Sequence, residues 1–248
     1  MSCLMQAIEQ VISPYQFRHS AFTESLPAGA AEQLRRVITH LPVKKGEVLF
    51  RQGSYARGVY LLECGKVKVY QEKTAGQRRI IHIYGNGDLL GYRPLFTDDI
   101  HSFTAEALEP CMLQFIPKDA FSALVAESPS FAQFMLKAIS REFAAWSNFQ
   151  AAFESSPVRS RVALAMLILH EKYRLPGNTT AVIQFTRTDL AEYVGASLET
   201  VVRTLRDLKE SGVVHIRGRR MLVNDVESLL ALASPTIGLP NARLAAQA

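Results

Sequence analysis

One stretch of the chain decides the fold: residues 186–212 read TRTDLAEYVGASLETVVRTLRDLKESG. Thr186 followed three residues later by Asp189 is a capping-box pattern, which marks the start of a helix. Gly195 supplies the backbone freedom of a sharp turn, and Ser197 is a good cap for a second helix. The stretch therefore predicts a helix, a tight turn and a second helix of the kind that enters a DNA groove.

The second of these helices has two different faces. One face carries apolar side chains at the spacing of buried positions, namely Val201, Leu205 and Leu208. The opposite face carries charged side chains at a similar spacing, namely Glu199, Arg203 and Arg206. The alternative is an ordinary solvated helix face. We favour a groove-binding helix over a solvated one, because the turn, the helix cap and the charged stripe all indicate the same structure.

A hairpin is predicted directly after the two helices. Residues 213–217 and 221–224 are β-branched or apolar runs, and Gly218-Arg-Arg220 separates them as a basic tip. Residues 181–185 have the composition of a further strand. Two helices followed by a hairpin make a winged helix, in which Arg217, Arg219 and Arg220 would lie near a phosphate backbone. A solvated hairpin tip is the alternative reading of these arginines.

Charge is distributed unevenly along the 248 residues, whose formal net charge is +5. Residues 155–225 hold 11 Lys and Arg against 7 Asp and Glu, whereas residues 1–154 hold 16 against 15. The positive excess therefore falls on the predicted winged helix, as a module that binds a polyanion requires.

The sequence has the features of a soluble cytoplasmic protein that needs no membrane. No run of 18 apolar residues is present, and the N-terminus lacks the basic-then-apolar order of a signal peptide. The three cysteines, Cys3, Cys64 and Cys111, are widely spaced and odd in number, which excludes a disulfide framework and a CxxC metal site. We expect reduced structural thiols, with Cys64 and Cys111 packed in strands.

Short β-type runs punctuated by glycine fill residues 42–117. Their close spacing and the alternation in Lys66-Val-Lys-Val69 indicate an antiparallel jelly roll or barrel. The runs are residues 46–51, 58–63, 65–70, 79–84, 101–107 and 112–116.

Three segments of this region resemble a known fold. Residues 42–53 (PVKKGEVLFRQG), 63–69 (ECGKVKV) and 87–91 (GDLLG) look like the cyclic-nucleotide-binding fold. These segments occur in the same chain as the predicted helix-turn-helix of residues 186–212. With this combination the protein resembles the CRP/FNR superfamily of bacterial transcription regulators, over about residues 20–226. The ordered combination is more specific than any single motif.

The resemblance implies an α+β protein: an antiparallel β-roll, a long dimerisation helix and a C-terminal winged helix-turn-helix. The sensor roll with flanking helices would take residues 1–128, and the long helix with its hinge residues 129–156. The DNA-binding domain would take residues 157–226, and residues 227–248 would hold a helix end and a flexible tail of unknown role. The resemblance also implies binding of palindromic DNA as a homodimer, with RNA polymerase as a further partner.

The long helix is also indicated by the residues themselves. Residues 130–154 contain no Gly or Pro, and Pro157 marks a hinge. Spacings of alternating 4 and 3 indicate a helix-helix seam. Its members are Met135, Ile139, Glu142, Trp146, Phe149 and Phe153. Burial of this stripe against its own domain is the alternative, and Phe134, Leu136 and Phe143 widen the stripe so that two sides could be covered.

Positions in the family that enter the major groove fall on Ser197, Glu199, Thr200, Val202 and Arg203 of this sequence. Arg203 suits guanine O6 and N7, and Glu199 suits a cytosine amine. Leu198 departs from the family pattern, since relatives often have an arginine there, so the operator sequence stays open. Arg187, Thr188 and Arg206 are further candidate DNA contacts on the same two helices.

The sensor's ligand is harder to predict. In cyclic-AMP-binding members a carboxylate holds the ribose and an arginine-serine pair holds the phosphate; here Asp88 and His101-Ser102 take those places. Because a neutral imidazole cannot replace a guanidinium, cyclic AMP in the usual mode is not expected, although Arg93 offers another cation. The candidate effector pocket is Gly87, Asp88, Leu89, Arg93, His101 and Ser102. An effector of another kind, or none, stays open.

Metal and haem cofactors are not expected. The iron-sulfur mechanism of the FNR type needs four cysteine ligands. Haem would need an axial ligand such as His82 or Cys64, yet a lone strand histidine is more often an ordinary core or surface residue.

Two other classes of protein compete with a DNA-binding regulator. A cupin-like enzyme would need clustered His and Glu ligands, but the roll has only His82 and His101. A regulatory subunit acting through protein contacts alone would not need a basic winged helix. We therefore expect a regulator that is not an enzyme; whether it activates or represses transcription is not legible from the sequence.

Overall fold

The computed structural model describes residues 3–17, 26, 30–73, 76–97, 99–175 and 177–237. These residues form two compact units. The β unit comprises residues 17–142, and the helical unit comprises the chain from residue 143 together with the N-terminal segment up to Gln16. Each unit is described by itself below.

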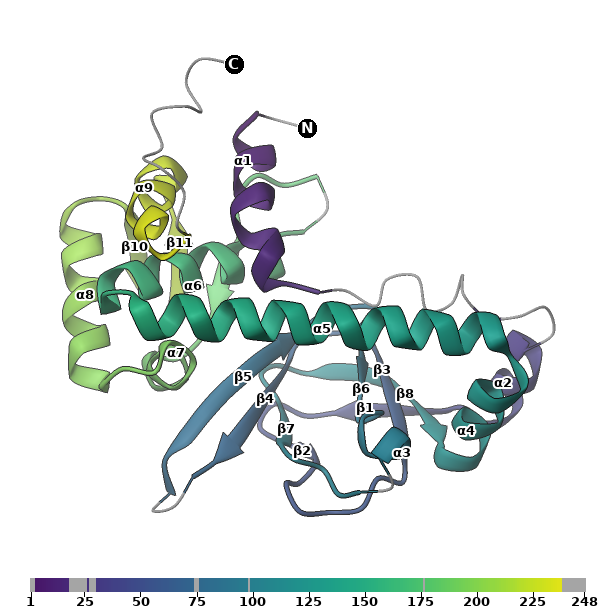
Figure 1. Cartoon of the computed structure of the whole chain (residues 1–248). Helices are drawn as coiled ribbons and strands as arrows, with labels where there is room; N and C mark the ends of the chain where they lie inside the picture. The colour runs from purple at the N-terminus through teal and green to yellow at the C-terminus, as the bar shows by residue number, and fades with distance from the viewer. Residues whose placement is uncertain are drawn as a thin grey trace. The chain divides into compact units, whose positions relative to one another are not determined.

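Two four-stranded antiparallel sheets build the β unit (Figure 1). The first sheet has the order β1 (Thr39–Val43), β8 (Cys111–Pro117), β3 (Gly58–Cys64) and β6 (Leu89–Leu90). The second has the order β2 (Val48–Phe50), β7 (Thr104–Ala107), β4 (Val67–Glu72) and β5 (Arg78–Tyr84). The antiparallel roll predicted from the short glycine-punctuated runs is therefore confirmed, with β1 and β6 as additional strands.

Helices pack on this roll through a shared apolar core. α2 (Ala30–Val37), α3 (Pro94–Thr97), α4 (Lys118–Glu127) and the first half of α5 (Pro129–Ser155) belong to the β unit. Buried side chains from strands and helices meet in one cluster, which includes Leu34, Val59, Ile116, Phe121 and Met135. A long helix over residues 130–154 is therefore confirmed, and its N-terminal half is part of the core of this unit.

The predicted seam of α5 is largely used inside the chain itself. Met135 is fully buried and Ile139 packs against the core cluster, while Glu142 is 3% exposed. Farther along, in the helical unit, Phe149 stacks on Phe153 at 3.9 Å, and both rings lie near Tyr193. Four of the predicted seam residues, Met135, Glu142, Phe149 and Phe153, are thus buried within the chain itself. A 4-and-3 repeat shows which face is covered but not by what, so a dimer seam at Ile139 and Trp146 stays a prediction.

A different face of α5 is left open. Leu136 and Phe143 are each 66% exposed, and Trp146 is 40% exposed. The widened apolar stripe seen in the sequence thus has two sides, of which the described residues cover one.

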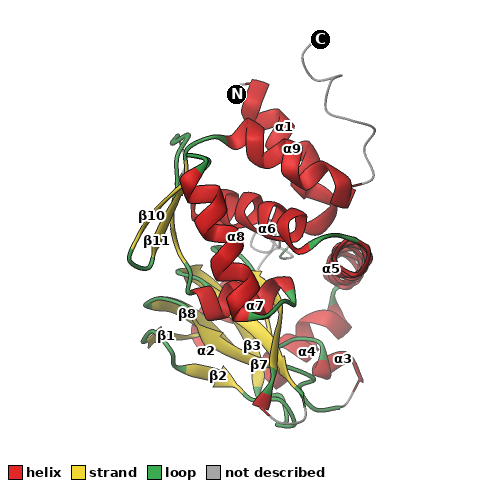
Figure 2. Ribbon diagram, turned by 90° about the vertical axis from the view of Figure 1, so that its left-hand side faces the viewer, coloured by secondary structure: helices red, strands yellow, loops and turns green. Residues whose placement is uncertain are grey.

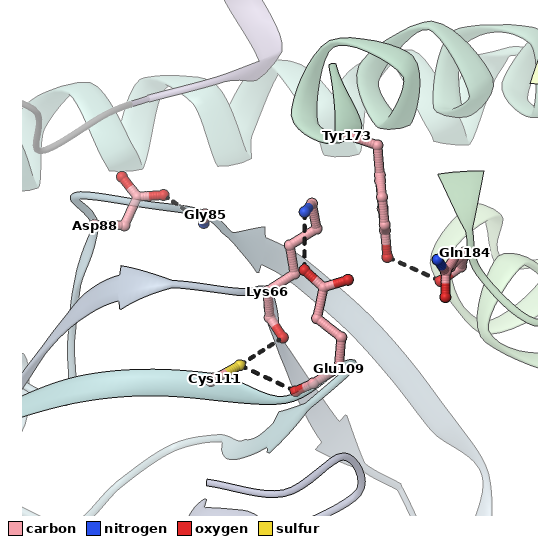
Figure 3. Close-up of polar contacts among 7 residues, drawn as sticks. All are labelled: Lys66, Gly85, Asp88, Glu109, Cys111, Tyr173 and Gln184. Carbon is pink, nitrogen blue, oxygen red and sulfur yellow. Dashed lines mark hydrogen bonds and ion pairs between the residues drawn. The ribbon is translucent and has the colours of Figure 1, made fainter. Parts of the chain in front are cut away.

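The helical unit is organised around α6 (Val158–Tyr173), whose residues 162–169 are all buried (Figure 2). Against it pack α7 (Arg187–Val194), α8 (Leu198–Glu210) and α9 (Val226–Ile237). A three-stranded antiparallel sheet has the order β10 (Val214–Arg217), β11 (Arg220–Val223) and β9 (Val182–Gln184). The predicted hairpin and its third strand are confirmed, and the Tyr173 hydroxyl fixes β9 to α6 by donating to the Gln184 carbonyl at 2.8 Å (Figure 3).

The N-terminal segment belongs to this unit as well. α1 (Cys3–Ile12) lies along α9 and also contacts α6, and it buries Ile8 and Ile12 (Figures 1 and 2). The short 3₁₀ helix η1 (Ser13–Tyr15) follows α1. Its Pro14 carbonyl accepts a hydrogen bond of 2.9 Å from the side-chain amide of Asn148. Residues 3–16 thus belong to the helical unit and not to the roll in which they were expected. The i, i+4 pair of isoleucines predicts an apolar face but not the surface that covers it.

Two expectations about single residues differ from the structure or lie outside it. Cys111 is buried in β8, where its thiol donates to the Lys66 and Glu109 carbonyls (Figure 3), whereas Cys64 at the end of β3 is exposed rather than packed. The flexible tail was expected from Ser234 onward, but α9 continues to Ile237, and residues 238–248 lie outside the described residues. None of the described helices is long and apolar enough to span a bilayer.

Candidate nucleic-acid interface

Three local features, two helix caps and one glycine turn, define the helix-turn-helix. The Thr186 hydroxyl accepts from the Asp189 amide at 3.0 Å and donates to the Asp189 carboxylate at 2.5 Å, so the N-terminus of α7 is capped. Gly195 has a left-handed φ of 63°, which lets the chain turn at once after α7. The Ser197 hydroxyl accepts from the Thr200 amide at 3.1 Å and caps α8. All three predictions from the sequence are confirmed.

Packing then fixes the orientation of α8 within its unit. Val201, Leu205 and Leu208 are buried, as predicted from their spacing. The Arg161 guanidinium on α6 donates to the Val194 and Gly195 carbonyls at 2.8 and 3.2 Å, so the carbonyls at the end of α7 are satisfied. Sequence reasoning missed Arg161; the one available signal was an arginine directly before the apolar run of residues 162–169.

The other face of α8 is open to solvent. Glu199, Arg203 and Arg206 are exposed, and Arg206 makes only a loose contact of 3.9 Å with Glu210. Two apolar side chains accompany them, since Leu198 and Val202 are 48% and 47% exposed. Acceptors, donors and methyl groups therefore share one helix face, which is the mixture that base edges in a major groove require.

The wing places its cations at the turn between β10 and β11. Arg217, Arg219 and Arg220 are all exposed there. Arg187, at the start of α7, is half-buried and donates to the Gly218 carbonyl, so it braces the wing tip against the helix-turn-helix. Thr188 is exposed beside it. The structure thus brings the predicted DNA contacts of this unit onto its open α7, α8 and wing surfaces.

In the β unit, the candidate effector residues fall into two groups. Arg93, His101 and Ser102 line a cavity of about 280 Å³. Gly87, Asp88 and Leu89 do not line it, and the Asp88 carboxylate accepts from the Gly85 amide at 2.8 Å instead (Figure 3). The expected place of Asp88 in the pocket is therefore wrong, because the carboxylate closes its own tight turn.

The cavity's arginine is tied to a carboxylate on α5. Arg93 donates to Glu142 through both Nε and Nη2, and the hydroxyls of Tyr84 and Tyr92 donate to the same carboxylate. Burial, followed by the charge of Glu142, raises the pKa of both tyrosines, so their hydroxyls stay protonated. Burial acts to lower the pKa of Arg93, but the neighbouring Tyr84 and Glu142 outweigh it and raise that pKa. Sequence reasoning did not find this network.

The cavity's histidine carries no charge at neutral pH. His101 is buried and stacks on Phe50 at 4.0 Å. Burial lowers the pKa of His101 to about 4. The predicted inability of this residue to clamp a phosphate therefore has a structural basis.

The two residues considered as haem ligands have different surroundings. His82 stacks on Phe17 at 4.2 Å and meets Tyr84 edge-on, while Cys64 is exposed. Among the residues that the structure describes, no group of three or more His, Cys, Asp or Glu side chains is placed to hold a metal ion.

Comparison with protein families matches both units. The cyclic nucleotide-binding domain model matches residues 40–128, and the Crp-like helix-turn-helix domain model matches residues 160–232. Together the two matched stretches take up more than half of the chain.

Two similar proteins match most of the chain. The chain is 28% identical over 204 residues to the anaerobic regulatory protein of Haemophilus influenzae, covering 81% of this chain and 79% of that protein. It is 26% identical over 208 residues to the fumarate and nitrate reduction regulatory protein of Escherichia coli, covering 83% of each.

Solved structures share the fold. FixK2 from Bradyrhizobium japonicum matches with a TM-score of 0.71 at 22% identity, over 79% of this chain and 97% of that one. A CRP/FNR-family regulator of Thermus thermophilus matches with a TM-score of 0.67 at 21% identity, over 79% and 98%. With a nucleotide-binding-type roll, a long helix and a winged helix-turn-helix in this order, the chain belongs to the CRP/FNR superfamily of DNA-binding transcription regulators rather than to a family of enzymes.

Proposed function

We propose that two copies of this chain bind a two-fold symmetric DNA site, each inserting α8 into a major groove. The observation that supports this most directly is the open face of α8. Its buried side holds the helix in place through Val201 and Leu205, and its exposed side carries Glu199, Val202 and Arg203. A two-fold pair would present two such helices about 34 Å apart, on successive major grooves.

The base contacts of α8 are assigned from the donors, acceptors and methyl groups that its side chains offer. Arg203 can donate two hydrogen bonds to guanine O6 and N7, and Glu199 can accept from a cytosine amine. The exposed methyl groups of Leu198 and Val202 lie four residues apart on the same helix, so they suit thymine methyls. The half-site would therefore combine at least one G·C pair with an A·T pair.

Phosphate contacts are assigned to hydroxyls and to the wing. The Ser197 and Thr200 hydroxyls are 2.8 Å apart at the N-terminus of α8, where backbone amides and the helix dipole favour an anion. Arg217, Arg219 and Arg220 supply charge from the wing. These groups would set affinity and register without selecting a sequence.

The second copy is proposed to pack on the open face of α5. Leu136 and Phe143 are separated by one heptad, and the small, exposed Ser140 and Ser147 alternate with them. A seam of large and small side chains suits close packing of two equivalent helices. The double variant Leu136→Asp with Phe143→Asp should lower the mass measured by light scattering to that of one chain, whereas Lys137→Asp on the same helix should leave it unchanged.

The regulator is proposed to work in the cytoplasm, where its DNA lies, and RNA polymerase is the further partner that the family suggests. Neither a cysteine-ligated cluster nor haem is part of the proposal, since the sequence holds three cysteines and His82 is engaged in ring stacking.

Selection of binding sites from random duplexes tests the proposal. Purified chain should enrich a sequence with two inverted half-sites, one helical turn apart from centre to centre. Enrichment of a single, asymmetric half-site would contradict the dimeric arrangement. Failure to enrich any sequence, with a folded protein, would contradict base readout by α8.

A further inference from the structure

Aromatic side chains form part of the wall of the cavity in the β unit. Its volume is about 280 Å³, and the rings of Phe50, Tyr84, Tyr92 and Phe103 contribute to its wall. Drug-sized ligands in proteins occupy cavities of about 300–1,000 Å³, so this one suits a molecule of one or two rings. Aromatic walls favour a flat aromatic guest, because offset or edge-on ring pairs are favourable beyond the burial of area.

The described part of the lining offers no uncompensated positive charge. Among the lining residues that the structure describes, Arg93 is the one Lys or Arg side chain, and its guanidinium is bonded to Glu142 while lying 5.3 Å from the Phe103 ring. His101 is neutral at pH 7, because burial lowers its pKa to about 4. Asp99 adds a carboxylate to the wall. An anionic ligand would lose its hydration here without gaining a free cation.

The groups that would hold a cyclic nucleotide in the usual mode are also committed elsewhere. The Asp88 carboxylate, which would meet the ribose, accepts from the Gly85 amide and is not part of the cavity wall. The place of the phosphate-binding guanidinium is taken by His101, whose ring stacks on Phe50. The charge and the position of these groups therefore argue against a phosphate-bearing ligand.

One carboxylate connects the cavity to α5. Tyr84, Tyr92 and Arg93 all line the cavity, and all three donate to Glu142. Glu142 is 3% exposed and lies within α5, the helix that continues into the helical unit. A guest that moves either tyrosine ring or Arg93 must therefore change the hydrogen bonds of Glu142.

We propose that this cavity binds a small uncharged aromatic molecule, and that Glu142 passes its occupancy to α5 through Tyr84, Tyr92 and Arg93. The ligand site and its coupling to α5 are claims about the β unit and do not depend on DNA binding.

A matched pair of probes tests the ligand class. 2-Naphthamide and 2-naphthoate have nearly the same shape and differ in charge, so titration calorimetry on the full chain isolates the charge preference. The amide should bind at least tenfold more tightly than the acid, and cyclic AMP should give no heat. Equal or tighter binding of the acid, or no binding of the amide, would overturn the proposal.

Location is tested by filling the cavity. Ile100 lies in the cavity wall and is 38% exposed, so Ile100→Trp can place an indole in the cavity without disturbing the core. This variant should lose amide binding at least tenfold. Lys73→Trp adds the same ring at an exposed position outside the wall and should bind the amide like the unchanged chain. An equal loss in both variants, or in neither, would place the amide elsewhere.

Coupling is tested at Glu142. Glu142→Gln keeps the shape of the side chain but leaves Arg93 uncompensated, so the preference should shift at least tenfold toward 2-naphthoate. In the unchanged chain the amide should alter hydrogen exchange of α5 amides 135–142. That change should be reduced in Tyr92→Phe, which keeps the ring and removes one bond. An unshifted preference in a folded Glu142→Gln chain, or exchange that does not respond to the amide, would refute the coupling. DNA binding that persists in either case would leave the proposed function intact.

Discussion

The arginines of α8 and the arginine of the cavity in the β unit have opposite surroundings. On α8, Arg203 and Arg206 lie exposed, and their nearest ionic contact is the loose 3.9 Å approach of Arg206 to Glu210, which is worth little in water. In the β unit, Arg93 is bonded to the buried Glu142, which also binds two tyrosine hydroxyls. An arginine attracts an anion only when its charge is not already compensated. The comparison therefore separates a surface suited to a polyanion from a cavity unsuited to one.

Removing the carboxylate should have the largest effect. Glu142→Ala leaves Arg93 and two tyrosine hydroxyls without their shared acceptor, which should lower the free energy of unfolding of the β unit by about 3 kcal/mol. This is the lower end of the usual range, because the Arg93 side chain is 41% exposed and can turn to water. Urea unfolding measures the loss. Glu127→Ala, an exposed glutamate on α4, should change stability by less than about 0.5 kcal/mol. Equal effects would mean that the network adds nothing to stability.

Removing an arginine from α8 should change sequence preference instead of stability. Arg203→Ala should reduce discrimination at one guanine by about 1–3 kcal/mol, while the unfolding midpoint stays the same. Competition binding with duplexes substituted at single positions measures this. If the variant lost affinity for specific and random DNA equally, Arg203 would be a phosphate contact and not a base contact.

The neutral histidine predicts a smaller, pH-dependent effect. The unfolded chain protonates His101 below about pH 6.5, whereas the folded chain keeps it neutral down to about pH 4. Its contribution to stability is thus fully present above pH 6.5 and is lost as the pH falls toward 4. His101→Phe keeps a ring against Phe50 and removes the titration, so its melting temperature should depend less on pH between 7 and 5. Parallel pH profiles for the two chains would show that His101 is already solvated.

Changing one wing cation should have the smallest effect. Arg219→Ala should weaken binding to all duplexes alike, and the slope of log affinity against log salt should fall by about 0.9. Affinities measured at several salt concentrations give this slope. An effect confined to one base pair would place Arg219 in a groove rather than at the backbone.

The helix-turn-helix could be predicted in detail because its determinants are local. Thr186 and Asp189 cap α7, Gly195 makes the turn and Ser197 caps α8, all within a dozen residues. The buried and exposed faces of α8 follow from the helical period alone. Each of these features needs only neighbours in the sequence, so the structure had little left to decide there.

The sensor half of the prediction was less complete, for a physical reason. Asp88 was expected in the pocket, but its carboxylate accepts from the Gly85 amide, a competition that a motif alignment does not weigh. The ties between Arg93 and Glu142 span 49 residues, and those from Tyr84 and Tyr92 span 58 and 50. No pattern within one segment indicates such pairings.

By itself, the sequence determined the order of roll, long helix and winged helix, together with the caps, turns and open face of the recognition helix. These properties depend on local backbone preferences and on the period of apolar residues. Only the tertiary structure decided which partner covers each apolar face: Met135 and Phe149 of α5 are buried within the chain while Leu136 and Phe143 stay open, and α1 lies along α9. The hydrophobic effect requires that such faces be covered but is non-directional, so it does not specify by what.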